Sequence, residues 1–289
     1  MSDKYYYVPE VETHLLGSKH IDQTFKIQVM QPLTRRDGGE RFPVLYVTDG
    51  NLSFDFAKGI SHGLQATGEV ARYILIGIGY PGENPFAGSV LRCRDLTPAH
   101  RAEVPEWRRS RPIEGVPDIE GGKKRWNGAA DFLEFINHEL RALVDGRYPT
   151  IPDQRAYFGH SLGGALGLHA LFSGSKLFSR YVISSPDLFY DGDDHGIAAA
   201  RAFIASGQRL DAKVFMTVAG EEEFEADKQK SEFVSSFYRL AALLHRAKIQ
   251  GLDLTHRVFQ GETHMSVWPF AFSHGVRAVF GPADGPPLL

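Results

Sequence analysis

Residues 159–163, Gly-His-Ser-Leu-Gly, carry the clearest chemical signal in the sequence. They follow a short strand-like run, 156–158, and precede a helical run of small and apolar residues, 165–172. A turn that joins a strand directly to a helix exposes its central serine at the end of the strand, and flanking glycines let the two elements approach closely. We therefore predict that Ser161 is a nucleophile. The alternative interpretation is a glycine-rich packing turn.

A serine hydroxyl needs a neighbouring base, and in this chain order the base lies near the C-terminus. Of the twelve histidines, only His264 follows the last strand-like run, in a loop before the final helical segment. His256 falls within a strand pattern and His274 within a helical one, where structural histidines are usual. We predict His264 as the base, and we expect His160 to point away from the nucleophile.

The third member of a triad is a carboxylate that follows the penultimate strand-like run, 214–219. Residues 220–227 are rich in carboxylates, so several candidates compete there. We favour Glu223, because the acid usually lies a few residues past the strand. The other candidates in this loop are Glu221, Glu222, Glu225 and Asp227.

Backbone N–H groups are expected to bind the oxyanion that forms when a serine attacks a carbonyl group. The N–H of Leu162 lies at the N-terminus of the helix that follows Ser161, where the helix dipole favours negative charge. A second donor should come from the turn after the strand-like run 44–48. We favour Asn51, with Gly50 next, and the alternative is a plain turn.

The elements that position these residues alternate along the chain. Helical periodicity is clearest in 129–144 and 231–248. The alternation predicts an α/β fold, with a mostly parallel central sheet and helices on both faces, in a single domain over 1–280 followed by a flexible tail, 281–289. Short β-branched and aromatic runs predict its strands at 25–30, 44–48, 73–78, 156–158, 181–184, 214–219 and 254–259.

Residues 92–127 interrupt this alternation, and their prolines predict an irregular excursion near the active site. Residues 92–125 contain nine basic and six acidic side chains, a local charge of +3, whereas the rest of the chain sums to -6. One interpretation is a solvated loop. The other is a platform for an anionic or catecholate-bearing substrate, with Arg94 as the predicted contact.

Composition excludes several classes of function. A net charge of -3 over 289 residues gives no general affinity for nucleic acid or an anionic membrane, and no apolar stretch reaches the length of a membrane helix. The single cysteine, Cys93, excludes an intramolecular disulfide and a cysteine-rich zinc site. The N-terminus has no secretory pattern, so we expect a cytoplasmic protein, and nothing in the sequence indicates its oligomeric state.

No cofactor or metal is expected. Residues 77–82 match the Gly-x-Gly-x-x-Gly pattern of dinucleotide sites, but Pro81 and Pro85 remove the helix that would hold a pyrophosphate. A loop is therefore the favoured interpretation. No zinc-protease, phosphate-loop or calcium-loop pattern is present.

Taken together, these segments resemble the putative-esterase (esterase D-like) branch of the α/β-hydrolase fold, and particularly its siderophore esterases that cut enterobactin-type trilactones. The resemblance covers about residues 11–280 and implies ester hydrolysis without a cofactor, with Ser161 and His264 carried over directly. Some similar proteins work as a Ser-His pair without an acid. The matching segments are 46–51, 92–98, 130–136, 159–164 and 261–267.

The sequence thus predicts a serine carboxylesterase with a small-molecule ester as its partner. His264 takes the proton of Ser161, Glu223 orients the imidazole, and the acyl-enzyme is then hydrolysed by water. The family also includes general carboxylesterases, thioester hydrolases and acyltransferases. The alternative from another class is a non-catalytic binding protein on the same fold.

Overall fold

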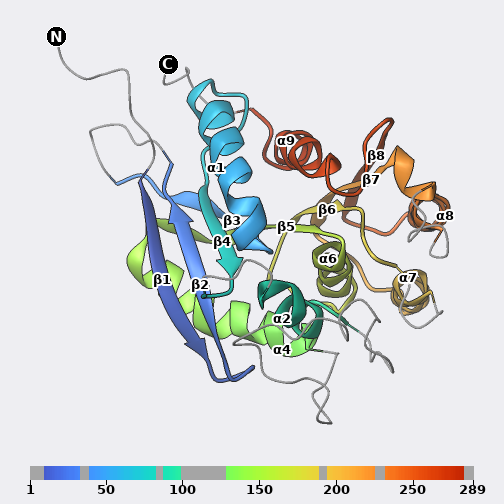
Figure 1. The fold of residues 1–289 in the computed structure, drawn as a ribbon. Coiled ribbons are helices and arrows are strands. Elements are labelled where there is room, and N and C mark those ends of the chain that lie inside the picture. Colours follow the sequence, from blue (N-terminus) through green and yellow to red (C-terminus); the bar gives the residue numbers. More distant parts are fainter. Residues whose placement is uncertain are drawn as a thin grey trace.

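The computed structural model describes residues 10–32, 39–82, 87–98, 128–188, 194–224 and 232–282. Within these residues, the strands form one eight-stranded sheet in the order β1-β2-β4-β3-β5-β6-β7-β8 (Figure 1). The β1–β2 and β2–β4 pairs are antiparallel, and every pair from β4 to β8 is parallel. The strands are β1 Val11–Ser18, β2 Gln23–Met30, β3 Phe42–Val47, β4 Ile74–Gly79, β5 Thr150–His160, β6 Arg180–Ser184, β7 Ala212–Ala219 and β8 Leu252–Phe259.

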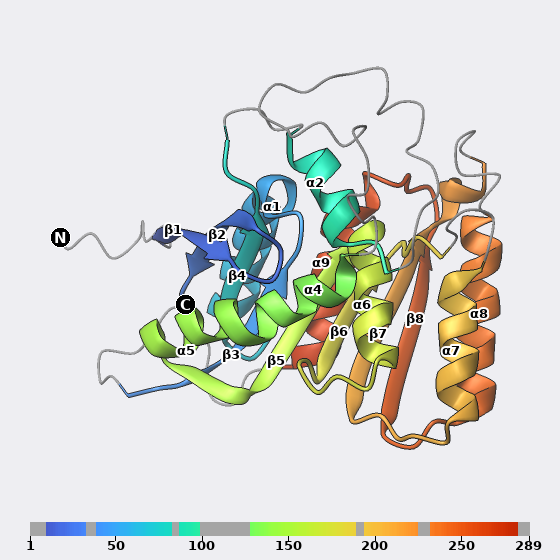
Figure 2. The ribbon, with the colours of Figure 1, turned by 90° about the horizontal axis from the view of Figure 1, so that it is seen from below.

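Helices cover both faces of the sheet, which confirms the predicted α/β fold (Figure 1). The helices are α1 Gly50–Ala66, α2 Ala87–Asp95, α4 Ala129–Glu134, the π-helical turn η1 Phe135–Leu140, α5 Arg141–Arg147, α6 Leu162–Phe172, α7 His195–Ala205, the 3₁₀ turn η2 Gly220–Glu223, α8 Phe233–Ala247 and α9 Val267–Phe280. Figure 2 shows α4 and α6 in front of the strands and α9 behind them. Phe54 of α1 and Phe272 of α9 share one core, whereas Leu166 of α6 and Phe237 of α8 belong to the other.

The central strands carry nearly continuous apolar sequence because both of their faces are covered. Every residue of β3 and of β4 is buried, as expected for strands inside a parallel sheet. Parallel strands end at the same edge, so the turns after β3, β5, β6, β7 and β8 lie along one side of the sheet. The predicted chemical residues follow four of these strands.

The prediction of an irregular excursion over 92–127 is wrong for its first four residues, because 92–95 belong to helix α2. Leu91, Cys93 and Leu96 are buried in the core on the α4 side of the sheet, which gives this segment an apolar helical face. The prolines begin only at Pro98, after the helix has ended. Residues 99–127 and the tail from 283 onward lie outside the described residues.

Two properties concern the described residues as a whole. No helix in the described ranges has both the length and the apolar character needed to cross a membrane. Across the same ranges, His, Cys, Asp and Glu side chains nowhere gather in a group of three or more that could hold a metal ion. The Cys93 thiol is buried and donates a hydrogen bond to the carbonyl oxygen of Ser89 at 3.4 Å.

Candidate active site

Ser161 occupies the sharp turn between β5 and α6. Its backbone has φ 59° and ψ −118°, a strained conformation for a residue with a side chain. A Cβ atom on Gly159 would lie 2.3 Å from the carbonyl oxygen of Gly163, so no side chain fits there. The Ser161 N–H donates to Ser184 at 3.0 Å, which ties the turn to the end of β6. This geometry is the one predicted for a nucleophilic serine.

The N-termini of α1 and α6 lie together at the ends of the adjacent strands β3 and β5. Gly50 is the first residue of α1 and Leu162 the first of α6. A Cβ atom on Gly163 would lie 2.5 Å from Thr48 Oγ1 and 3.6 Å from Asp49 Oδ2, so the two turns are in contact. First-turn N–H groups have no acceptor within their own helix, which suits them to an oxyanion.

Asn51 fixes the first turn of α1 through its side chain. Its Nδ2 donates to the carbonyl oxygen of Tyr80 at 2.8 Å, and its Oδ1 accepts from the Tyr80 N–H at 2.6 Å. A Cβ atom on Gly79 would lie 2.3 Å from that Oδ1, so the approach requires a glycine. The side chain is thereby committed to β4, and only the backbone of Asn51 suits the predicted role as an oxyanion donor.

His264 lies in the turn between β8 and α9, and its Nδ1 is hydrogen-bonded to Glu222 Oε1. A histidine that uses Nδ1 on a carboxylate presents Nε2 for proton transfer. The ring of His264 also lies close to β5, because its centroid is 4.4 Å from that of His160, the residue before Ser161. The predicted base therefore stands beside the end of the strand that carries the predicted nucleophile.

Glu222 is completely buried, and both of its carboxylate oxygens have partners. While Oε1 faces His264, Oε2 accepts hydrogen bonds from Ser185 Oγ at 2.8 Å and from the Ala219 N–H at 2.9 Å. Ser185 has φ 40°, in the left-handed region, directly after β6. Ser185 is not among the site residues predicted from sequence. Its position after the strand-like run 181–184, at the same sheet edge as Ser161, is the signal that could have found it.

The structure does not support Glu223 as the partner of His264, because Glu222 is the glutamate that pairs with this histidine. Glu223 accepts hydrogen bonds from the N–H groups of Val234 and Ser235 at 2.9 and 3.2 Å, and from Ser235 Oγ at 2.5 Å. Burial raises the pKa of Glu223, but these hydrogen bonds outweigh it and lower the pKa. Glu223 therefore supports the start of α8. Glu225 and Asp227 lie outside the described residues, and the Glu221 N–H donates to Glu262.

The other histidines singled out by sequence have partners away from Ser161. His160 Nδ1 lies 2.9 Å from Ser184 Oγ, and its ring packs nearly perpendicular to that of Trp268 on α9. His256 pairs with His245 at 3.0 Å, and His274 with Arg257 at 2.8 Å. Burial, together with these neighbours, lowers the pKa of both His256 and His274.

Arg94, the predicted substrate contact, is paired with its neighbour Asp95. Its Nε and Nη2 donate to the two carboxylate oxygens at 2.5 and 3.1 Å. Asp95 is completely buried and also accepts from Tyr80 Oη at 2.9 Å. Burial raises the pKa of Asp95 despite these partners. This environment is typical of a structural ion pair rather than of an arginine that binds a substrate.

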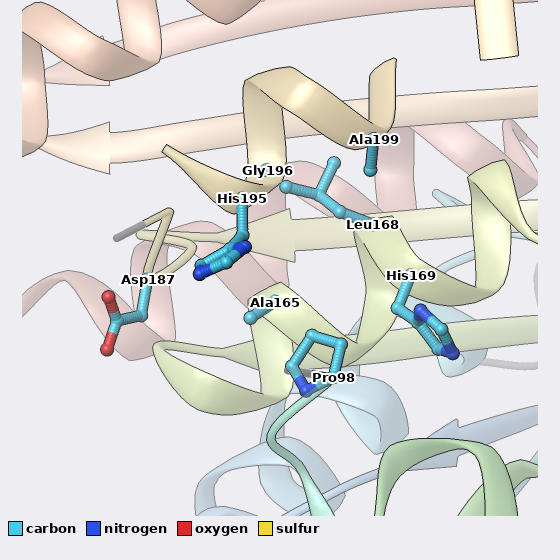
Figure 3. Close-up of a pocket in the computed structure, with 8 residues that line it drawn as sticks. All are labelled: Pro98, Ala165, Leu168, His169, Asp187, His195, Gly196 and Ala199. Carbon is cyan, nitrogen blue, oxygen red and sulfur yellow. The ribbon is translucent and has the colours of Figure 1, made fainter. Parts of the chain in front are cut away.

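A cavity of about 210 Å³ lies between α6 and α7, next to the turn that carries Ser161 (Figure 3). Two of its lining residues, Ala165 and Asp187, donate their backbone N–H groups to the Ser161 carbonyl oxygen at 3.0 and 3.1 Å. Burial lowers the pKa of His169, which favours a neutral imidazole in the wall. The cavity is lined by Pro98, Ala165, Leu168, His169, Asp187, His195, Gly196 and Ala199.

Comparison with known proteins agrees with this geometry, since residues 18–279 match the family described as Putative esterase. The chain belongs to the Putative esterase family. This membership confirms the resemblance found in the sequence and identifies the protein as a carboxylic-ester hydrolase.

Two curated relatives of this esterase are enzymes named for siderophores. Ferri-bacillibactin esterase BesA of Bacillus subtilis is 27% identical and aligns over 97% of this chain and 93% of its own. Siderophore triacetylfusarinine C esterase of Aspergillus fumigatus is 28% identical, with 89% of each chain covered. Among solved structures, the BES protein from Bacillus cereus matches with a TM-score of 0.76 at 24% identity, over 96% of this chain and 97% of its own, which supports the fold.

Proposed function

We propose that this esterase hydrolyses the ester bonds of a siderophore through an acyl-enzyme formed on Ser161. The observation that carries the proposal is the hydrogen bond between His264 and the buried Glu222, next to the strained serine turn. A buried carboxylate on Nδ1 holds the imidazole in the tautomer that can accept a proton at Nε2. A non-catalytic binding protein would have no use for this arrangement.

In this mechanism, His264 Nε2 takes the proton of Ser161 as Oγ attacks the ester carbonyl carbon. The negative charge that develops on the carbonyl oxygen is stabilised by the N–H of Leu162 and by an N–H from Gly50 or Asn51. The imidazolium, stabilised by Glu222, then donates its proton to the departing alcohol oxygen. Water, activated by the same imidazole, attacks the acyl group and releases Ser161 and the free acid.

The siderophore part of the proposal is supported by the relatives' names and by the cavity beside Ser161. The cavity walls combine apolar side chains with two histidines and an aspartate, so they suit a compact polar substituent better than a long aliphatic chain. Small residues on α6 and α7, Ala165, Gly196 and Ala199, leave the space for such a substituent.

The test is a hydrolysis screen with enterobactin, bacillibactin, triacetylfusarinine C, a neutral aryl ester and an acyl-glutathione thioester. We expect the highest kcat/KM on a siderophore, with acid and alcohol products identified by mass spectrometry and no turnover by Ser161→Ala. A kcat/KM for the thioester or the aryl ester far above that of every siderophore would overturn the substrate assignment. Covalent labelling by a fluorophosphonate at a residue other than Ser161 would overturn the mechanism.

A further inference from the structure

Arg92 of α2 forms a bidentate ion pair with Asp49, the residue before α1. Its Nε donates to Asp49 Oδ1 at 2.6 Å and its Nη2 to Oδ2 at 2.9 Å. The Arg92 side chain is 18% exposed and that of Asp49 only 5%. Such a planar two-bond contact fixes direction as well as distance, so it holds Asp49 in one orientation.

Asp49 sits where the predicted oxyanion donors begin. Its backbone lies in the left-handed region, with φ 59° and ψ 37°, and its side chain makes no capping hydrogen bond to α1. Its carbonyl oxygen accepts from the N–H groups of Leu52 and Ser53 at 2.9 and 3.0 Å. The orientation of the Asp49–Gly50 peptide therefore decides where the first N–H groups of α1 point.

The same guanidinium also reaches the serine turn. Arg92 Nη2 lies 3.5 Å from the carbonyl oxygen of His160, the residue before Ser161. One side chain thus touches the turn that carries the nucleophile and the turn that carries the second oxyanion donor. Its distance to His160 is at the limit for a hydrogen bond, so the main restraint is on Asp49.

Charge gives Arg92 a second effect. A Cβ atom on Gly163, in the first turn of α6, would be only 3.6 Å from Asp49 Oδ2, so this carboxylate lies beside both helix N-termini. A bare carboxylate there would repel an oxyanion held by the same N–H groups. The guanidinium neutralises the carboxylate and keeps the site favourable to negative charge.

We propose that Arg92 is a positioning residue that aligns the oxyanion donors of α1 through Asp49 and neutralises this carboxylate. Arg92 acts through Asp49 and is not assigned a contact with the substrate. The inference rests on the proposed acyl-enzyme chemistry of Ser161, but not on the identity of the siderophore.

Arg92→Met, Arg92→Lys and the double variant Arg92→Met with Asp49→Asn provide the test. Arg92→Met alone would leave the Asp49 carboxylate buried without its partner, which could prevent folding. The double variant removes both charges, so it keeps the experiment informative in that case. Arg72→Met is the matched control. Arg72 makes a similar bidentate pair with Glu40, at 2.8 and 2.5 Å, but precedes β4 at the opposite edge of the sheet.

Three quantities would be measured on each purified variant: kcat and KM for a neutral aryl ester, the inhibition constant of a boronic acid, and the midpoint of thermal unfolding. A boronic acid adds to the serine oxygen as a tetrahedral adduct with an oxygen in the oxyanion site, so its affinity reports the alignment of the donors. KM reports substrate binding when chemistry is slow.

We expect Arg92→Met to lower kcat by about 10- to 100-fold, less than the loss of an entire oxyanion donor, with KM changed by less than about threefold. Boronic acid affinity should fall by a similar factor. Arg92→Lys should recover part of both losses, because it keeps the charge but not the bidentate contact. The double variant should remain impaired, and Arg72→Met should match the wild type in all kinetic values.

An unchanged boronic acid affinity in a folded Arg92 variant would overturn the inference, as would a loss confined to KM or an equal loss in Arg72→Met. If the wild type cleaves the aryl ester but no siderophore, the siderophore proposal fails. The role of Arg92 is still tested in that case, because its measurements use the aryl ester and the boronic acid. If neither the aryl ester nor the boronic acid acts on Ser161, both proposals fail.

Discussion

The turn after β5 and the turn after β7 place Ser161 and Glu222 at the same sheet edge, but by different means. The β5 turn is determined locally, because the strained Ser161 backbone and the crowded Gly159 leave few other sequences possible. The β7 turn has three consecutive glutamates, and only its contacts with distant residues distinguish them. The turn that carries Ser161 can therefore be predicted from its neighbours in sequence, whereas the glutamate that pairs with His264 cannot.

Glu222 and Glu223 are adjacent in sequence but contact different parts of the protein. In a 3₁₀ turn, successive side chains point about 120° apart, so adjacent glutamates face different parts of the protein. Glu222 faces His264 and Ser185, whereas Glu223 faces the first turn of α8.

The largest effect should come from the β5 turn. Ser161→Ala removes the atom that becomes acylated, so kcat should fall by about a million-fold while the unfolding midpoint stays close to that of the wild type. The measurement is ester hydrolysis by protein freshly purified under conditions that exclude wild-type contamination. Near-normal turnover by the folded variant would show that another residue is the nucleophile.

Glu222→Gln should have the next largest effect. The amide keeps the shape of the carboxylate but no longer stabilises the imidazolium or enforces the tautomer, and a comparable change in a serine protease triad costs about 10⁴-fold in kcat. We expect a loss of about 10³- to 10⁴-fold, measured as kcat on the best substrate. A loss of only a few fold would mean that Ser161 and His264 work as a pair without an acid.

The fold and the positions of Ser161 and His264 at one edge of the sheet could be predicted, because each leaves a pattern in the sequence. Alternating strands and helices indicated the sheet, and chain order singled out His264 among twelve histidines. The glutamate that pairs with His264 differs by one residue from the predicted Glu223, because a run of glutamates does not show which of them a 3₁₀ turn will direct toward the histidine. Arg94 is predicted as a substrate contact from local charge, but that charge does not show that its guanidinium pairs with the next residue, Asp95, whose burial depends on tertiary packing.

Ser185→Ala tests the support behind Glu222. Removing the hydroxyl takes one of two donors from Oε2, so the carboxylate is held less firmly against His264. We expect kcat to fall by about 10- to 30-fold, near the lower end for a hydrogen bond to a charged group, with KM nearly unchanged. Ser185→Thr is the matched control, because it keeps the hydroxyl, and its kcat should be close to that of the wild type. A loss in KM alone would contradict the assignment.

Glu223→Gln should have the smallest effect on turnover, less than about threefold, but a measurable effect on stability. The pKa of Glu223 is lowered below its ordinary value of 4.5, so its ionised form stabilises the folded protein. That contribution is complete above the unfolded-state pKa and is lost as pH falls through the folded-state pKa. Urea unfolding should therefore show the wild type more stable than Glu223→Gln at pH 7, with the difference shrinking as pH drops below about 4.5. A difference that is constant with pH would mean that the charge of Glu223 contributes nothing at the start of α8. A turnover loss larger than that of Glu222→Gln would reverse the assignment of the two glutamates.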